Sequence, residues 1–237
     1  MKIKAVLFDL DGTLLPMDQE LFVKAYMGGL VRVAASLGYE AGAVANGILA
    51  GTAAMVKNDG KITNEELFWQ VLAERVGKSI LDRREIFDGF YRTEFQEIKA
   101  VCGFEPRAKE LVDFVKSRGL RVALATNPLF PSVATESRIG WAGLEPSAFE
   151  LFTSYETSRH CKPNLDYYRD VLSAMNLSAE ECLMVGNDVG EDMIAKELGM
   201  RVFLLDGCVI NRGGEDISEY PGGTISDLIK FIDKVSC

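Results

Sequence analysis

The chain has 237 residues, of which 48% are hydrophobic and 26% are charged, a globular composition that argues against disordered, collagen-like and coiled-coil proteins. Acidic residues outnumber basic ones by 35 to 26, so the net charge of −9 makes nucleic acid and anionic membrane surfaces poor partners. No apolar run approaches the roughly 20 residues of a membrane span, and residues 1–10 lack a signal-peptide pattern. We therefore expect a cytoplasmic protein.

Cysteine and histidine usage excludes several classes of site. The five cysteines are scattered and form no CxxC pair, which favours reduced thiols over disulfides or a zinc site. The single histidine, His160, excludes a three-histidine metal site and an HExxH protease, and neither GxSxG nor GxxxxGK[ST] occurs. The cysteines are Cys102, Cys161, Cys182, Cys208 and Cys237.

The chain begins with an apolar run at 2–9 that predicts a buried strand, and residues 16–100 follow without a convincing strand. That stretch is too long for an ordinary crossover and predicts helices at 19–37, 41–56, 63–76 and 81–97. The third should open with a capping box at Thr63 and Glu66. We expect residues 16–100 to form a small helical domain with its own core, including Phe68 and Trp69.

In residues 101–237, predicted strands alternate with predicted helices. Strands are expected at 121–126, 151–156, 181–187 and 201–206, and helices at 106–117, 163–175, 191–198 and 225–235. This alternation predicts an α/β fold, a doubly wound parallel sheet of five strands, built from residues 1–15 and 101–237. The glycine-rich stretch 207–223 is expected to be only a surface loop.

Polar residues follow several of these predicted strands. Asp9 and Asp11 stand two apart on an extended chain, so their side chains project to the same side. Ligands of open α/β sheets bind beyond the carboxyl ends of the strands, where the other strands deliver further polar residues. These are Thr126, Asn127, Lys162, Asn187, Asp188, Glu191 and Asp192. Singly each has an ordinary interpretation as a turn or helix-end residue, but their joint placement predicts one site.

This candidate site holds more acid than base, since Lys162 is its one obvious cation. Two like charges about 4 Å apart repel by about 4 kcal/mol at an effective dielectric constant of 20, so a cation is needed there. Oxygen ligands favour Mg²⁺, which is held by one or two carboxylates together with a substrate phosphate. The sequence thus favours a magnesium-assisted reaction on a phosphoryl group.

The four clusters, Asp9-x-Asp11-Gly12-Thr13, Thr126-Asn127, Lys162-Pro163 and Gly186-Asn187-Asp188-x3-Asp192, resemble the motifs of the haloacid dehalogenase superfamily. Motif order and a helical insertion after the first strand extend the resemblance over the whole chain. It is closest to the capped phosphatases, which implies a Rossmann-like core, a cap at residues 16–100 and a small phosphorylated metabolite as substrate.

The resemblance also implies a role for each residue. Asp9 would attack phosphorus and form an aspartyl-phosphate, and Asp11 would protonate the leaving group and then activate water. Thr126 and Asn127 would bind the phosphoryl oxygens, and Lys162 would offset negative charge on Asp9 and on the phosphoryl group.

Mg²⁺ would bind the Asp9 carboxylate, the Asp11 carbonyl oxygen and the fourth motif. That motif departs from the common Gly-Asp pattern because Asn187 follows Gly186. We favour Asp188 as the metal carboxylate, with the Asn187 amide oxygen as the alternative. Asp192 is expected to orient its neighbours, through Lys162 or a metal-bound water.

The same residues also bear on whether the protein has another activity of this superfamily. Expelling halide needs no proton, so Asp11 argues against a dehalogenase. A β-phosphoglucomutase-like phosphotransferase uses the same paired acids and remains the alternative enzyme. The altered fourth motif leaves open a non-catalytic module that binds a phosphorylated metabolite. The sequence gives neither the substrate nor the oligomeric state.

Overall fold

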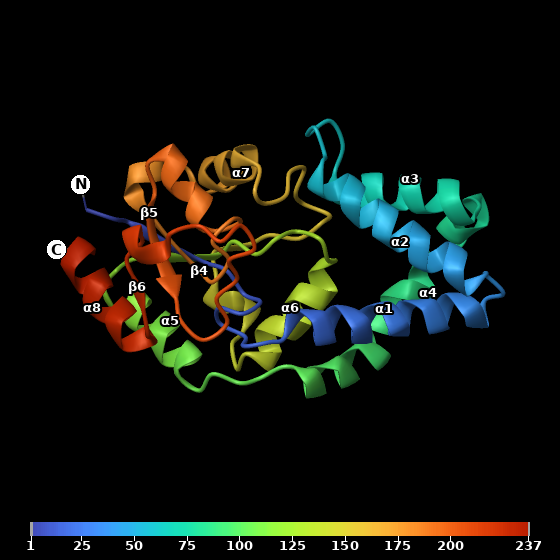
Figure 1. The fold of residues 1–237 in the computed structure, drawn as a ribbon, viewed down its shortest axis with the longest axis horizontal. Helices are drawn as coiled ribbons and strands as arrows, with labels where there is room; N and C mark the ends of the chain where they lie inside the picture. The colour runs from blue at the N-terminus through green and yellow to red at the C-terminus, as the bar shows by residue number, and fades with distance from the viewer. Residues whose placement is uncertain (1, 237) are drawn as a thin grey trace.

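A computed structural model describes residues 2–236 and contains one parallel sheet flanked by helices (Figure 1). The strand order is β3-β2-β1-β4-β5-β6, and every neighbouring pair is parallel. The α/β class and the doubly wound sheet expected from the sequence are confirmed. The strands are β1 (Ala5–Phe8), β2 (Arg121–Leu124), β3 (Leu151–Phe152), β4 (Cys182–Gly186), β5 (Arg201–Leu205) and β6 (Gly222–Gly223).

The expected count of five strands is wrong by one. The sixth strand, β6, pairs with β5 at the sheet edge and consists of two glycines. A glycine pair carries none of the apolar or β-branched pattern from which a strand is predicted. The expectation that 207–223 is only a surface loop is therefore also wrong.

Eight α-helices lie among the described residues, and short 3₁₀ segments connect several of them. The helices are α1 (Gln19–Ser36), α2 (Ala41–Val56), α3 (Asn64–Val76), α4 (Arg84–Arg92), α5 (Arg107–Ser117), α6 (Ser132–Trp141), α7 (Leu165–Met175) and α8 (Ile225–Ser236). The 3₁₀ segments are Lys78–Arg83, Glu94–Val101, Pro146–Ala148, Ala179–Glu181, Met193–Leu198 and Ile217–Glu219. None of the helices in residues 2–236 has the length and apolar character that crossing a membrane requires.

Both faces of the sheet are buried, which explains its apolar strands. Along β1, Val6 and Phe8 pack in one core with residues of α5 and α8, whereas Ala5 and Leu7 pack in a second core with residues of α7. Each of these four side chains has no exposed surface. Burial on both faces makes β1 apolar throughout, and burying one Leu or Phe side chain contributes about 1.5–3 kcal/mol.

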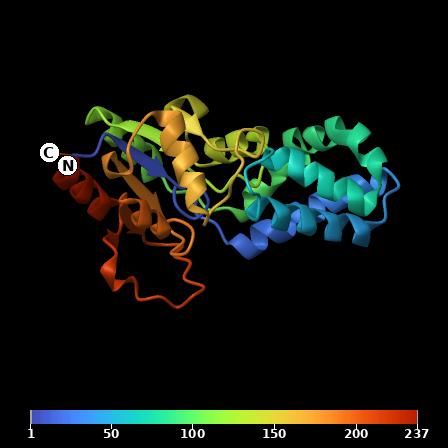
Figure 2. The same ribbon diagram turned by 90° about the horizontal axis from the view of Figure 1, so that it is seen from above.

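Helices α1–α4 pack together at one end of the molecule, away from the sheet (Figures 1 and 2). The expected capping box of α3 is present, since Thr63 Oγ1 accepts from the Glu66 amide and Glu66 Oε2 accepts from the Thr63 amide. The helix expected at 81–97 is interrupted. Thr93 leaves helical geometry, with φ −121° and ψ −94°, and α4 ends at Arg92.

The two connections between this helical layer and the sheet run side by side. Met17 and Cys102 form an isolated antiparallel bridge, and the Gly103 amide donates to the Pro16 carbonyl at 2.7 Å. Cys102, Cys161, Cys182 and Cys208 are free thiols. Cys237 lies outside the described residues.

Candidate active site

The chain after β1 is held in a sharp turn that keeps Asp9 and Asp11 at the carboxyl end of the sheet. The Asp9 amide still donates to the Val185 carbonyl at 2.9 Å, and the Gly12 amide donates to the Leu15 carbonyl at 2.8 Å. Gly12 has a φ of +90°, and a Cβ there would lie 2.3 Å from the Asn187 side chain. Glycine is therefore required at this position.

Lys162 lies fully buried beneath Asp9. Its Nζ donates to Asp9 Oδ1 at 2.9 Å and to Asp192 Oδ1 at 2.6 Å. Burial opposes the lysine charge, but the carboxylates of Asp192 and Asp9 raise the pKa of Lys162 well above its usual value. The ammonium group therefore stays charged and fixes one oxygen of Asp9.

Asp192 joins this lysine to the end of β4. Its second oxygen, Oδ2, accepts from the Asp188 amide at 3.0 Å. A Cβ on Gly186 would lie 2.0 Å from Asp192 Oδ2, so only glycine leaves room for the carboxylate. The expected helix at 191–198 is a 3₁₀ segment, Met193–Leu198, and the turn before it is held by Asp188 Oδ1, which accepts from the amides of Gly190 and Glu191.

The two residues of the fourth motif that could bind a metal differ in charge and in their contacts. Asn187 is neutral and hydrogen-bonded at both amide atoms, since Oδ1 accepts from the Thr13 hydroxyl at 3.0 Å and Nδ2 donates to the Cys208 carbonyl at 2.7 Å. Asp188 Oδ2 instead accepts from Arg212 at 2.8 Å. The Arg212 side chain is 65% exposed and can move away.

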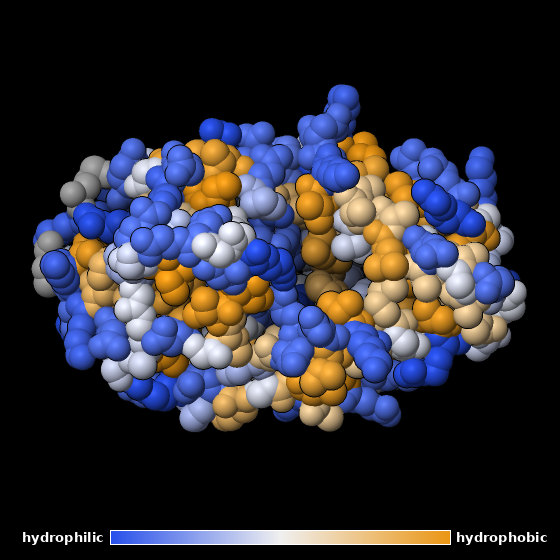
Figure 3. Space-filling view, viewed as in Figure 1, coloured by the Kyte–Doolittle hydropathy of each residue, from blue (hydrophilic) through white to orange (hydrophobic). Residues whose placement is uncertain are grey.

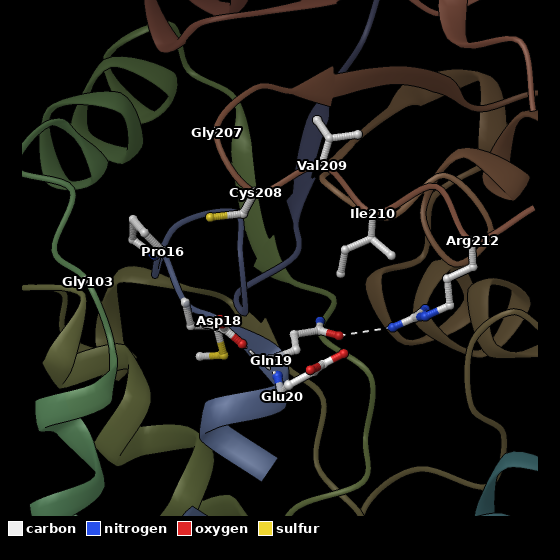
Figure 4. A pocket seen from close by; sticks show the side chains of 11 residues that line it. Pro16, Asp18, Gln19, Glu20, Gly103, Gly207, Cys208, Val209, Ile210 and Arg212 are labelled. Carbon is white, nitrogen blue, oxygen red and sulfur yellow. Dashed lines mark hydrogen bonds between the residues drawn. The ribbon is translucent and has the colours of Figure 1, made fainter. Parts of the chain in front are cut away.

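The stretch 207–212 and residues 16–20 at the start of α1 line opposite sides of a pocket beside these residues (Figure 4). Arg212 Nη2 donates to Gln19 Oε1 at 3.0 Å, as the dashed line in Figure 4 marks. Ile210 bridges to Asp188 in parallel register. This stretch therefore supports the fourth motif, a role that its glycine-rich sequence did not indicate.

Thr126 and Asn127 follow strand β2. The buried Thr126 carbonyl accepts from the Thr153 hydroxyl at 2.6 Å and from the Tyr167 hydroxyl at 2.8 Å. Asn127 Nδ2 donates to Glu191 Oε2 at 2.9 Å. Asn127 Oδ1 is buried and has no hydrogen-bond partner within residues 2–236.

Arg138 is a residue of the site that sequence reasoning missed. It lies on α6 with its side chain fully buried and forms an ion pair with Asp11 Oδ2. Its guanidinium also lies 4.3 Å from the centre of the Phe130 ring. Pro131 directly before Ser132 is a helix-start pattern and indicates α6. No sequence pattern identifies Asp11 as the partner of Arg138.

Asp11 has one oxygen free inside the protein. Its Oδ1 is buried and finds no partner among the described residues. Burial raises the pKa of Asp11 to about 6; the charge of Arg138 opposes this shift and that of Asp9 adds to it. Near neutral pH, both the charged and the neutral form of this carboxyl group are therefore accessible.

These residues line one cavity of about 230 Å³. Of the residues predicted for the site, Lys162 alone does not line it, and it reaches the cavity through Asp9. Five carboxylates line the cavity, against the three neighbouring cations Lys162, Arg138 and Arg212. The carboxylates belong to Asp9, Asp11, Asp188, Glu191 and Asp192.

The residues present fit a magnesium ion better than a zinc ion. Within residues 2–236, no three His, Cys, Asp or Glu side chains converge as a ready metal site. Mg²⁺ needs only one or two carboxylates, and it completes its coordination with carbonyl oxygens, waters and phosphate. Asp9 and Asp188 supply such oxygens, and the cavity carries excess negative charge.

Comparison with known proteins agrees with this architecture. A glyceraldehyde 3-phosphate phosphatase of Methanocaldococcus jannaschii is 26% identical over 235 residues, which are 97% of each chain. The structure of a predicted phosphoglycolate phosphatase from Haemophilus somnus 129PT aligns over 98% of each chain with a TM-score of 0.60 and 17% identity. L-2-haloacid dehalogenase from Xanthobacter autotrophicus aligns over 98% of each chain with a TM-score of 0.58 and 18% identity.

The two solved structures have the same fold as this chain. The family model for haloacid dehalogenase-like hydrolases matches residues 3–199, which include all four motif clusters. The chain therefore belongs to the haloacid dehalogenase-like hydrolases, and it is an enzyme of that family.

Proposed function

We propose that the protein is a Mg²⁺-dependent phosphatase that hydrolyses a small phosphorylated metabolite through an aspartyl-phosphate on Asp9. The observation that carries this proposal is the state of Asp11, whose buried, unpartnered oxygen belongs to a carboxyl group with a pKa of about 6. A general acid that later acts as a base works best with a pKa near the working pH. The leaving group of a dehalogenase is a halide ion, which needs no proton.

In the first step, Asp9 Oδ2 attacks phosphorus and the bond to the leaving oxygen breaks. Lys162 holds the other Asp9 oxygen, so the attacking oxygen has a fixed direction. Asp11 Oδ1 gives its proton to the departing alkoxide. Lys162, the Thr126 hydroxyl and the amides of Thr126 and Asn127 stabilise the charge that develops on the phosphoryl oxygens.

In the second step, ionised Asp11 takes a proton from water, and the water oxygen attacks phosphorus. Inorganic phosphate leaves and the Asp9 carboxylate is restored. Asp9, the Asp11 carbonyl oxygen and Asp188 would hold Mg²⁺, and Asn187, which is hydrogen-bonded to Thr13 and to the Cys208 carbonyl, would support the turn. When bound, the ion offsets charge on the phosphoryl oxygens.

We also propose that residues 16–100 act as a cap domain on the core formed by residues 1–15 and 101–237. The paired connections at Met17 and Cys102 support a hinge at these boundaries. Closure of the cap would exclude bulk water from the aspartyl-phosphate.

The test is inorganic phosphate release from a panel that includes p-nitrophenyl phosphate, glyceraldehyde 3-phosphate and sugar phosphates, with Mg²⁺ and with EDTA. We expect release that depends on Mg²⁺ and disappears in Asp9→Asn. Asp113→Asn, a change of an exposed aspartate on α5, is the matched control and should keep full activity. Isomerised sugar phosphate without released phosphate would contradict the proposal and indicate a phosphotransferase.

A further inference from the structure

A second cavity, of about 150 Å³, adjoins the polar one and lies within the helical layer. Its wall is almost entirely aliphatic and aromatic, and no charged side chain lines it. Figure 3 shows apolar surface around the hollow between the two halves of the molecule. Helices α1–α4 contribute most of the wall, including Leu30, Ile48, Phe68, Trp69 and Leu72.

The two cavities are neighbours, because Val23, Leu129 and Phe130 line both. Leu129 and Phe130 directly follow the segment that carries Thr126 and Asn127. A molecule whose phosphoryl group lies against Asp9 therefore has the apolar cavity as the neighbouring space for its organic part.

The position of Asp11 indicates on which side of the phosphoryl group the organic part of the substrate lies. Asp11 faces the leaving oxygen in the proposed reaction, and its partner Arg138 lies over the Phe130 ring at 4.3 Å. Phe130 belongs to the shared wall. The carbon bonded to the leaving oxygen therefore starts beside the mouth of the apolar cavity.

The few polar groups of this cavity are poor partners for a polyhydroxylated ligand. The hydroxyls of Tyr26 and Tyr91 hydrogen-bond to each other at 2.7 Å. Burial raises the pKa of Tyr26 to about 12, so this pair stays neutral. A hydroxyl group moved from water into such a space loses its hydrogen bonds and gains few, which is unfavourable.

We propose that this cavity binds the alcohol part of the substrate and that this part is apolar. The inference rests on the proposed phosphatase function and specifies its substrate class as phosphomonoesters of apolar alcohols. An apolar cavity of about 150 Å³ holds one benzene ring, so the group is about one six-membered ring or a chain of about six carbons. Phe68 and Trp69, expected only in the cap core, thereby also form the substrate-binding wall.

The experiment compares kcat/KM for phosphate release from unbranched alkyl phosphates, from ethyl to decyl phosphate, with glyceraldehyde 3-phosphate as the polar comparator. Unbranched alkoxides have similar basicity, so differences report the binding of the chain. We expect kcat/KM to rise about fourfold per added methylene and to stop rising at about six carbons.

Thr52→Phe places a ring in the cavity without touching the polar site. This variant should lose the dependence on chain length and keep release from ethyl phosphate. Leu21→Phe is the matched control, because Leu21 is 51% exposed on α1 and lines neither cavity. It should behave as the unaltered protein does.

A binding measurement separates this inference from the proposed function. In Asp9→Asn, alkyl phosphates should change the fluorescence of Trp69, with an affinity that rises with chain length and falls in the added Thr52→Phe variant. A kcat/KM for phosphate release that stays constant or falls with chain length would overturn the proposal of an apolar substrate but not the proposal of a phosphatase. If no ester releases phosphate, the phosphatase fails; chain-length-dependent binding then still supports the apolar site, and its absence overturns it.

Discussion

The ion pair between Arg138 and Asp11 allows a quantitative prediction about stability. Arg138→Met keeps the apolar stem of a fully buried side chain and removes the charge that opposes the raised pKa of Asp11. Without this charge, the pKa of Asp11 in the native state should rise above about 6. The native state then keeps a proton that the unfolded chain has lost.

The sign and size follow from the pKa. In the unaltered protein, native Asp11 binds its proton more tightly than the unfolded chain does. Its contribution to stability therefore falls as pH rises from the ordinary value of 3.8 to about 6, and then levels off. In Arg138→Met the fall continues to the higher pKa. One pKa unit is 1.36 kcal/mol, so each unit by which the substitution raises this pKa should cost the variant about 1.4 kcal/mol more at pH 8 than at pH 5.

Urea unfolding of both proteins between pH 5 and pH 8, in EDTA, measures this difference. A packing cost of the substitution adds a constant that does not vary with pH. In an Asp11→Asn background, Arg138→Met should show the constant alone, which completes a double-mutant cycle. A loss of stability that is independent of pH, or that shrinks as pH rises, would refute the assigned coupling.

Two further substitutions test the neighbouring contacts. In Gly186→Ala the new Cβ should displace Asp192 from Lys162. Breaking this buried pair should lower the free energy of unfolding by about 3–5 kcal/mol and abolish phosphate release. A Gly186→Ala variant of normal stability would contradict the assigned contact. Arg212→Gln removes an exposed cation from Asp188, so calorimetry should find Mg²⁺ bound up to about fivefold more tightly. Arg169→Gln, an exposed change on α7, should leave that affinity unchanged, and weaker binding in Arg212→Gln would speak against Asp188 as a ligand.

Most of the sheet could be predicted from the sequence because burial on both faces leaves a strong pattern. The apolar run around β1 predicts a strand whichever face each residue takes. Strand β6 could not be predicted, because its two glycines pair with β5 through their backbone alone. The helix expected at 81–97 is interrupted at Thr93 by a local change in backbone conformation, which apolar periodicity does not encode.

The candidate site could be predicted as a group because its residues follow successive parallel strands, whose ends a doubly wound sheet brings together. Arg138 has no such position, since it projects from the middle of α6 and meets Asp11 through tertiary packing. The same is true of Arg212, whose partners Asp188 and Gln19 are distant in sequence. Sequence patterns place helices and strands only approximately along the chain. They therefore do not predict contacts that depend on how these elements pack in the folded protein.

The central claim is that Asp9 becomes phosphorylated, and Asp11→Asn tests it most directly. With p-nitrophenyl phosphate the leaving phenolate needs no proton, so this variant should form the aspartyl-phosphate normally and hydrolyse it slowly. We predict a burst of p-nitrophenolate equal to the enzyme concentration, with mass spectrometry after an acid quench locating the phosphoryl group on Asp9. Steady turnover with no covalent phosphate, or with phosphate on another residue, would contradict the account.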